Sequence, residues 1–175
     1  MKTLLCSWLG IASQAAADEQ SALRGLLEAL DRLEPGRAKH LAQFAYLLGR
    51  IAHADQHVSA EETVVMESLV AREGGLPPDQ SVLVVGLAKT SNLLFGGTDN
   101  FVVAREFAAG ATQEQKLALL RCLFAVSAAE NNISTAEERE IQRVARELRI
   151  EHAALLALRL EYRRHLPGLS DQTAT

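Results

Sequence analysis

The sequence contains little of what marks several large classes of protein. Only 2 of its 175 residues are cysteines, which excludes a scaffold held together by disulfides. Prolines number 4, and aromatic residues make up 5% of the chain. The 22 acidic residues outnumber the 18 basic ones, and this net charge of −4 argues against a nucleic-acid partner. No apolar run reaches the roughly 18 residues of a membrane span, so we expect no conventional spanning helix.

The common catalytic motifs are also missing. The chain has no phosphate-binding loop, no nucleophile elbow, no His-Glu-x-x-His and no Cys-x-x-Cys. Helical bundles that hold catalytic metals use Glu-x-x-His pairs on facing helices, and this pattern is absent too. We therefore expect a non-enzymatic protein, with a metal-dependent hydrolase built on carboxylates as the enzymatic alternative.

Apolar residues recur at helical spacing along most of the chain, and alternating strand patterns are absent. The sequence predicts a compact all-α bundle of about seven or eight helices joined by short loops. We expect the Gly96-Gly97 pair to form a turn that separates two of these helices. The expected helices span about residues 19–33, 37–54, 60–73, 79–94, 100–109, 113–129, 135–148 and 152–165.

The chain divides into three parts. Residues 1–17 carry Lys2, an apolar run and a small-residue segment, which fits either an amphipathic N-terminal helix or a secretory signal peptide. Residues 18–166 form the helical domain, and residues 167–175 read as a flexible tail. We expect a cytoplasmic protein, with the inner face of the membrane as a further location, or an exported protein if residues 1–17 are a signal peptide.

An internal repeat appears when the chain is shifted along itself by 75 residues. Residues 51–62 then fall on residues 126–137, with identical residues at Ala54/Ala129, Ser59/Ser134 and Glu62/Glu137. Each copy lies between an apolar helix and an amphipathic one. The repeated unit is therefore a helix, an acidic loop and a second helix, and two such units suggest a bundle with two-fold pseudo-symmetry.

Each copy contains the signature of a capping box. Ser59 and Ser134 stand where a helix should begin, and Glu62 and Glu137 follow three residues later. In such a box the serine oxygen accepts a hydrogen bond from the glutamate N–H, and the glutamate side chain accepts one from the serine N–H. The spacing therefore predicts that a helix begins directly after each serine.

The acid at the start of each loop supports a second interpretation. Asp55 and Glu130 follow an apolar helix, at the end where the helix dipole disfavours negative charge. A cation would explain them, since carboxylate, hydroxyl and carbonyl oxygens suit Ca²⁺, Mg²⁺ or Mn²⁺. The alternative is that the loops only cap helices.

His53 and His57 flank Asp55 and could hold Zn²⁺ if the segment were helical, because they would then share one face. A helix that ends near Asp55 does not place the two histidines on one face.

At these residues the sequence resembles the TerB-like family, the tellurite-resistance-associated domain, whose relatives include the N-terminal domain of DjlA-type co-chaperones. The family signature is A-x-A-D-G-x-[VI]-[ST]-x-x-E, repeated after an apolar helix. Residues 52–62 and 127–137 follow it, except that Gln56 and Asn131 replace its glycine and Glu130 replaces its aspartate. The resemblance covers about residues 37–165. No His-Pro-Asp tripeptide follows, so co-chaperone activity is not implied.

The resemblance implies an all-helical module with two-fold pseudo-symmetry, linked to tellurite and chemical stress. It also implies divalent-metal binding by the acidic motif residues. Together with the serines of the caps, the candidate ligands are Asp55, Ser59, Glu62, Glu130, Ser134 and Glu137. The alternative is a metal-free interaction module, with a protein partner and association with a membrane surface.

Overall fold

The computed structural model describes residues 35–55 and 58–166, and within these ranges every regular element is a helix. The expected all-α fold is confirmed. The elements are α2 (Pro35–Ala52), α3 (Ala60–Gly74), α4 (Pro78–Gly110), α5 (Gln113–Ser127), α6 (Thr135–Glu147), α7 (His152–Glu161) and the short 3-10 helix η1 (Arg163–His165).

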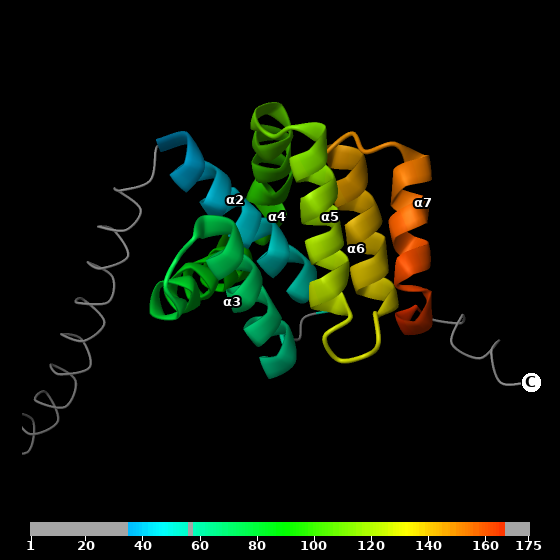
Figure 1. Ribbon diagram of the computed structural model, residues 1–175, viewed down its shortest axis with the longest axis horizontal. Coiled ribbons are helices and arrows are strands. Elements are labelled where there is room, and N and C mark those ends of the chain that lie inside the picture. The colour runs from blue at the N-terminus through cyan, green and yellow to red at the C-terminus, as the bar shows by residue number, and fades with distance from the viewer. Residues whose placement is uncertain (1–34, 56–57, 167–175) are drawn as a thin grey trace, which may run out of the picture.

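Helix α2 lies at the centre of the bundle. It packs most extensively on α4 and also contacts α3, α5 and α6. Figure 1 shows α5, α6 and α7 side by side, with α7 at the edge far from α3. The central position of α2 agrees with its sequence, because Leu47, Leu48 and Ile51 are all fully buried.

The core is continuous through the bundle and consists of aliphatic side chains with a few aromatic rings. Phe124 of α5 stacks on Tyr162 just after α7, with ring centroids 5.2 Å apart, and this contact holds the edge helix on the bundle. The largest fully buried side chains are Phe107, Phe124, Leu41, Leu47, Leu48, Ile51, Met66, Leu119, Leu120, Leu123 and Ile133.

The expected turn at Gly96-Gly97 is wrong, because α4 runs unbroken from Pro78 to Gly110. Two glycines inside a helix cost about 1 kcal/mol each, but packing overrides that propensity. Val85 and Asn92 lie buried before the glycine pair and Phe107 lies buried after it. The Asn92 side chain also donates hydrogen bonds to the carbonyls of Tyr46 and Ala88.

The repeated unit is visible in the fold as two helix pairs, α2 with α3 and α5 with α6. Figure 1 shows the end of α2, the start of α3 and the α5–α6 connection at the same lower end of the molecule. In the second connection Asn131 adopts a left-handed conformation with φ 62°, which asparagine tolerates better than most residues. The position where the family signature has glycine is therefore left-handed in this copy. Gln56, its counterpart, lies outside the described residues.

Several predictions fall outside the part of the chain that the structure describes. These are the N-terminal segment 1–17, the helix expected at residues 19–33 and the tail 167–175. Within the described ranges, no helix combines the length and apolar character needed to cross a bilayer.

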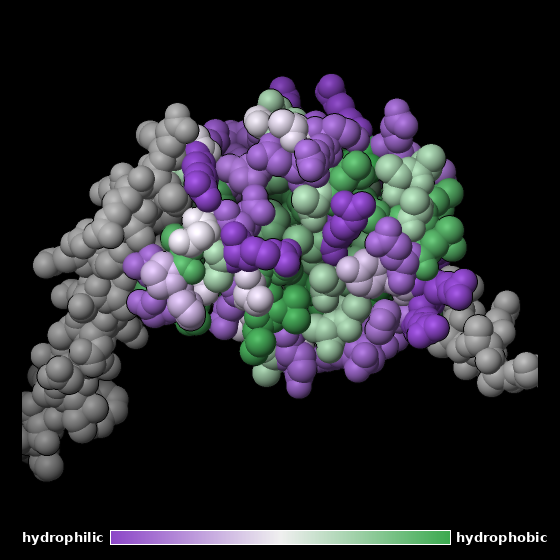
Figure 2. Space-filling view, viewed as in Figure 1, coloured by the Kyte–Doolittle hydropathy of each residue, from purple (hydrophilic) through white to green (hydrophobic). Residues whose placement is uncertain are grey.

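Cys122 is buried in α5 as a free thiol. Figure 2 shows polar side chains over much of one face and apolar ones at its right edge, over α7.

Candidate cation site between the two acidic loops

Both predicted capping boxes are present. The Ser59 N–H donates to Glu62 Oε2 at 2.8 Å, and the Glu62 N–H donates to Ser59 Oγ at 3.0 Å. In the second copy the Ser134 N–H donates to Glu137 Oε2 at 2.7 Å, and the Glu137 N–H donates to Ser134 Oγ at 3.2 Å. Helices α3 and α6 begin at the next residue. Each cap uses Oε2 of its glutamate, so capping does not occupy the whole carboxylate.

The two loops meet around one small cavity of about 50 Å³. Its walls combine residues of both repeats, although each acidic loop was interpreted separately in the sequence. Five of the six candidate ligands line it, whereas the Ser59 hydroxyl is turned to its cap. The lining residues are Asp55, Glu62, Ser127, Glu130, Asn132, Ser134 and Glu137.

The cavity has a buried floor and an exposed rim. Glu62, Ser127 and Glu137 are 6%, 2% and 4% exposed. Asp55 and Glu130 are exposed at the rim. The deep glutamates belong to the helix caps, and the rim acids lie in the turns that follow α2 and α5. This arrangement places carboxylates both inside the cavity and at its mouth.

The electrostatics of this cavity disfavour a full set of bare charges. The pKa of Glu62 is raised from its ordinary value to about 7, chiefly by burial and to a smaller extent by the nearby charges of Glu137 and Asp55. Hydrogen bonds from Ser59 act in the opposite direction. Because like charges close together resist ionisation, either a proton or a cation would relieve the repulsion.

Two oxygens on the cavity floor have no hydrogen-bond partner in the protein. They are Oε1 of Glu137, the oxygen not used by the cap, and Oγ of Ser127. Both residues are more than nine-tenths buried and line the cavity. Buried polar atoms are normally paired, and an exception points to a ligand or a functional role. An all-oxygen donor set of this kind fits a hard divalent cation such as Ca²⁺, Mg²⁺ or Mn²⁺.

The acidic groups do not themselves form a finished coordination shell. In residues 35–55 and 58–166, no group of three or more His, Cys, Asp or Glu side chains is placed to hold one metal ion. The structure also does not support the Zn²⁺ alternative through a helical His53 and His57. Helix α2 ends at Ala52, His53 lies in the turn that follows, and His57 lies outside the described residues.

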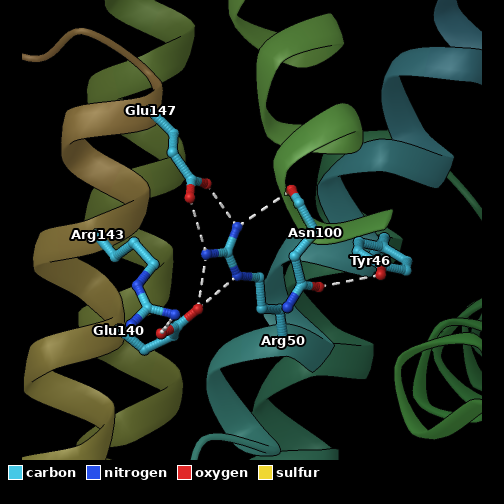
Figure 3. Close-up of polar contacts among 6 residues, drawn as sticks. All are labelled: Tyr46, Arg50, Asn100, Glu140, Arg143 and Glu147. Atoms are coloured by element: carbon cyan, nitrogen blue, oxygen red, sulfur yellow. Dashed lines mark hydrogen bonds and ion pairs between the residues drawn. The ribbon is translucent and has the colours of Figure 1, made fainter. Parts of the chain in front are cut away.

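A buried arginine joins the two repeats through an ion pair (Figure 3). The Arg50 guanidinium of α2 contacts Glu140 at 2.6 Å and Glu147 at 2.6 Å, both on α6, and donates to the Asn100 carbonyl at 3.2 Å. Burial lowers the pKa of Arg50, but its hydrogen bonds to Glu147 and Glu140 outweigh this and raise that pKa overall. Arg50 lies shortly before Asp55 in sequence, and Glu140 follows Glu137. The ion pair therefore sets the relative position of the two acidic loops.

Sequence reasoning missed three features of this region. Ser127 and Asn132 line the cavity, and Arg50 braces it. The repeat itself held a signal for the first, because a shift of 75 residues aligns Ser127 with Ala52 and so places a hydroxyl where the first copy has a methyl group. No comparable signal pairs Arg50 with glutamates 90 and 97 residues away.

Residues 41–160 match the family model described as tellurite resistance protein TerB. This range contains both acidic loops, both capping boxes and Arg50 with its two glutamate partners. Neither the curated proteins nor the solved structures gave a match.

Proposed function

This chain belongs to the TerB family, and on that premise we propose that it is a non-enzymatic module that binds one divalent cation between its two acidic loops. The observation that carries the proposal is the shared cavity. It joins the buried carboxylates of Glu62 and Glu137, which come from equivalent positions of the two repeats. The family's description links the proposed module to tellurite resistance.

The ligands follow from the depth of each group. Glu137 offers its unpartnered Oε1 on the floor, and Glu62 adds a second buried carboxylate. Asp55, Glu130 and Ser134 line the cavity nearer its rim, where the two acids attract a cation without joining Glu62 and Glu137 in one coordination shell. A bound cation neutralises charges that otherwise repel, so it stabilises the folded chain and ties α3 to α6. Ca²⁺, Mg²⁺ and Mn²⁺ suit these oxygen donors better than Zn²⁺.

A thermal-shift titration of the full chain with Ca²⁺, Mg²⁺, Mn²⁺ and Zn²⁺ tests the proposal. A ligand at 100 times its Kd stabilises by about 2.7 kcal/mol, which raises Tm by roughly 5–10 °C for a domain of this size. The informative variant is Glu62→Gln/Glu137→Gln. Glutamine also serves in a capping box, so this variant keeps both caps while it removes both charges.

We expect the wild type to respond to at least one cation and the double glutamine variant to lose that response. A response of equal size in both proteins would place the ion elsewhere. A wild type that ignores all four cations would leave the loops as helix caps and would refute the proposal.

One observation favours a protein-interaction module as the second candidate. Leu156 and Leu160 of α7 are 42% and 64% exposed, and their spacing of four puts them on one face of the edge helix. A partner helix would bury that face. Leu156→Ser/Leu160→Ser should then abolish the binding of a purified partner. Val64→Ser on α3, equally exposed at 64%, should leave it unchanged.

A further inference from the structure

Ser127 differs from the other polar residues of the cavity, because its hydroxyl serves no structural contact. It is the last residue of α5 and is 2% exposed. Its Oγ has no hydrogen-bond partner in the protein. In contrast, the hydroxyls of Ser59 and Ser134 are both used in helix caps. A buried hydroxyl without a partner costs folding free energy, so its place on the cavity floor requires an explanation.

The repeat shows that the fold does not need this hydroxyl. Ser127 aligns with Ala52, which is likewise the last residue of its helix and is fully buried. Alanine therefore satisfies the packing at the equivalent position of α2. The second repeat carries an extra oxygen there, and this oxygen lines the same cavity as the unpartnered Oε1 of Glu137.

We propose that the Ser127 hydroxyl is a direct ligand of the bound cation, and that its presence favours Ca²⁺ over Mg²⁺. The inference rests on the proposed cation site and extends it by one residue. Since no three acidic side chains of the described residues are placed to hold an ion together, neutral oxygens must complete the shell. Ca²⁺ accepts six to eight oxygens in variable geometry, whereas Mg²⁺ demands a strict octahedron and keeps several waters. Seven oxygen-bearing residues line the cavity, which suits the higher coordination number of Ca²⁺.

Isothermal titration of the chelator-treated full chain with CaCl₂ tests the role of Ser127. We expect Ser127→Ala to weaken Ca²⁺ binding roughly tenfold, which corresponds to about 1.4 kcal/mol. In EDTA the Tm of this variant should equal or exceed that of the wild type, because the substitution removes an unpaired buried hydroxyl. A structural serine would instead lower Tm and leave Ca²⁺ affinity unchanged.

Ser81→Ala is the matched control. Ser81 is also 2% exposed, but its Oγ donates to the Pro78 carbonyl at 2.8 Å, away from the cavity. This control should lower Tm in EDTA and keep full Ca²⁺ affinity. Ser127→Cys adds a test of direct contact, because a thiolate prefers soft ions. It should weaken Ca²⁺ binding and bind Cd²⁺ more tightly than the wild type does.

The outcomes separate this inference from the proposed function. If the wild type and Ser127→Ala bind Ca²⁺ equally and Ser127→Cys gains no Cd²⁺ affinity, the inference is overturned while the cation site stands. If Mg²⁺ binds the wild type more tightly than Ca²⁺, the stated preference is wrong. If the folded wild type binds neither ion, the proposed function fails and the inference fails with it.

Discussion

Glu62 and Glu137 lie 75 residues apart at equivalent positions of the two repeats, and both line one small cavity. Each accepts a hydrogen bond from its own capping serine through Oε2. The capping and cation-binding interpretations are therefore compatible, because a carboxylate has two oxygens. The cap orients the side chain, and the other oxygen of Glu137 remains without a partner on the cavity floor.

The first prediction separates the cap from the charge at Glu137. Ser134→Ala removes the acceptor of the Glu137 N–H and should destabilise the fold by about 1 kcal/mol. Glu137→Gln keeps the reciprocal cap and should cost clearly less. Urea denaturation in EDTA measures the loss of stability in both variants.

Thr112→Ala is the control, at the capping box of α5 away from the cavity. It should destabilise the fold about as much as Ser134→Ala and leave cation binding intact. Equal losses in Ser134→Ala and Glu137→Gln would contradict this division of roles.

The second prediction concerns pH. The pKa of Glu62 is raised to about 7 in the fold against an ordinary value of 4.5. The folded state therefore holds its proton more tightly than the unfolded state does, and stability falls as pH rises from about 4.5 to about 7. Between pH 5.5 and pH 8 in EDTA, this group should lower the free energy of unfolding by roughly 1–2 kcal/mol.

Glu62→Gln isolates this contribution, since glutamine does not titrate and still fits the cap. The loss of stability between the two pH values should be smaller in this variant by the stated amount. The same loss in both proteins would show that Glu62 is ionised throughout this range.

The sequence predicted the local parts of this site better than their assembly. Capping boxes depend on residues three apart, so their positions at Ser59 and Ser134 could be read directly and are confirmed. The shared cavity depends on the packing of α3 against α5 and of α5 against α6, which no local pattern encodes. For the same reason, the sequence did not show that Glu62 and Glu137 line the same cavity.

The wrong prediction of a turn within α4 has a related cause. Gly96-Gly97 carries a strong local signal for a turn. The burial of side chains on both sides of the pair against α2 is a long-range effect, and it keeps the helix continuous. Local propensity fails here because tertiary packing contributes more free energy than two glycines cost.

The third prediction concerns the buried arginine that joins the two repeats. Arg50→Met should destabilise the fold by about 3 kcal/mol or more, because Glu140 and Glu147 would be left half-buried without their cation. Arg50→Lys should restore little of this stability, since a single ammonium cannot reproduce the forked contacts of the guanidinium.

The control is Arg143→Ala. The Arg143 side chain is 62% exposed and contacts Glu140 at 3.4 Å, so its loss should cost under about 1 kcal/mol of stability. Comparable losses for Arg50→Met and Arg143→Ala in urea denaturation would disprove the bracing role.

The fourth prediction uses two helical glycines whose surroundings differ. A Cβ added at Gly86 on the exposed side of α4 would meet nothing within 4 Å. Gly86→Ala should therefore stabilise the protein by roughly 0.5–1 kcal/mol through its better helix propensity.

A Cβ at Gly49 of α2 would lie 2.8 Å from Asn92 Nδ2, and that amide donates hydrogen bonds to the carbonyls of Tyr46 and Ala88. Gly49→Ala should therefore lower Tm, because Asn92 must move and lose one of these bonds. If Gly49→Ala were as stabilising as Gly86→Ala, the close approach of α2 and α4 at Asn92 would be wrong.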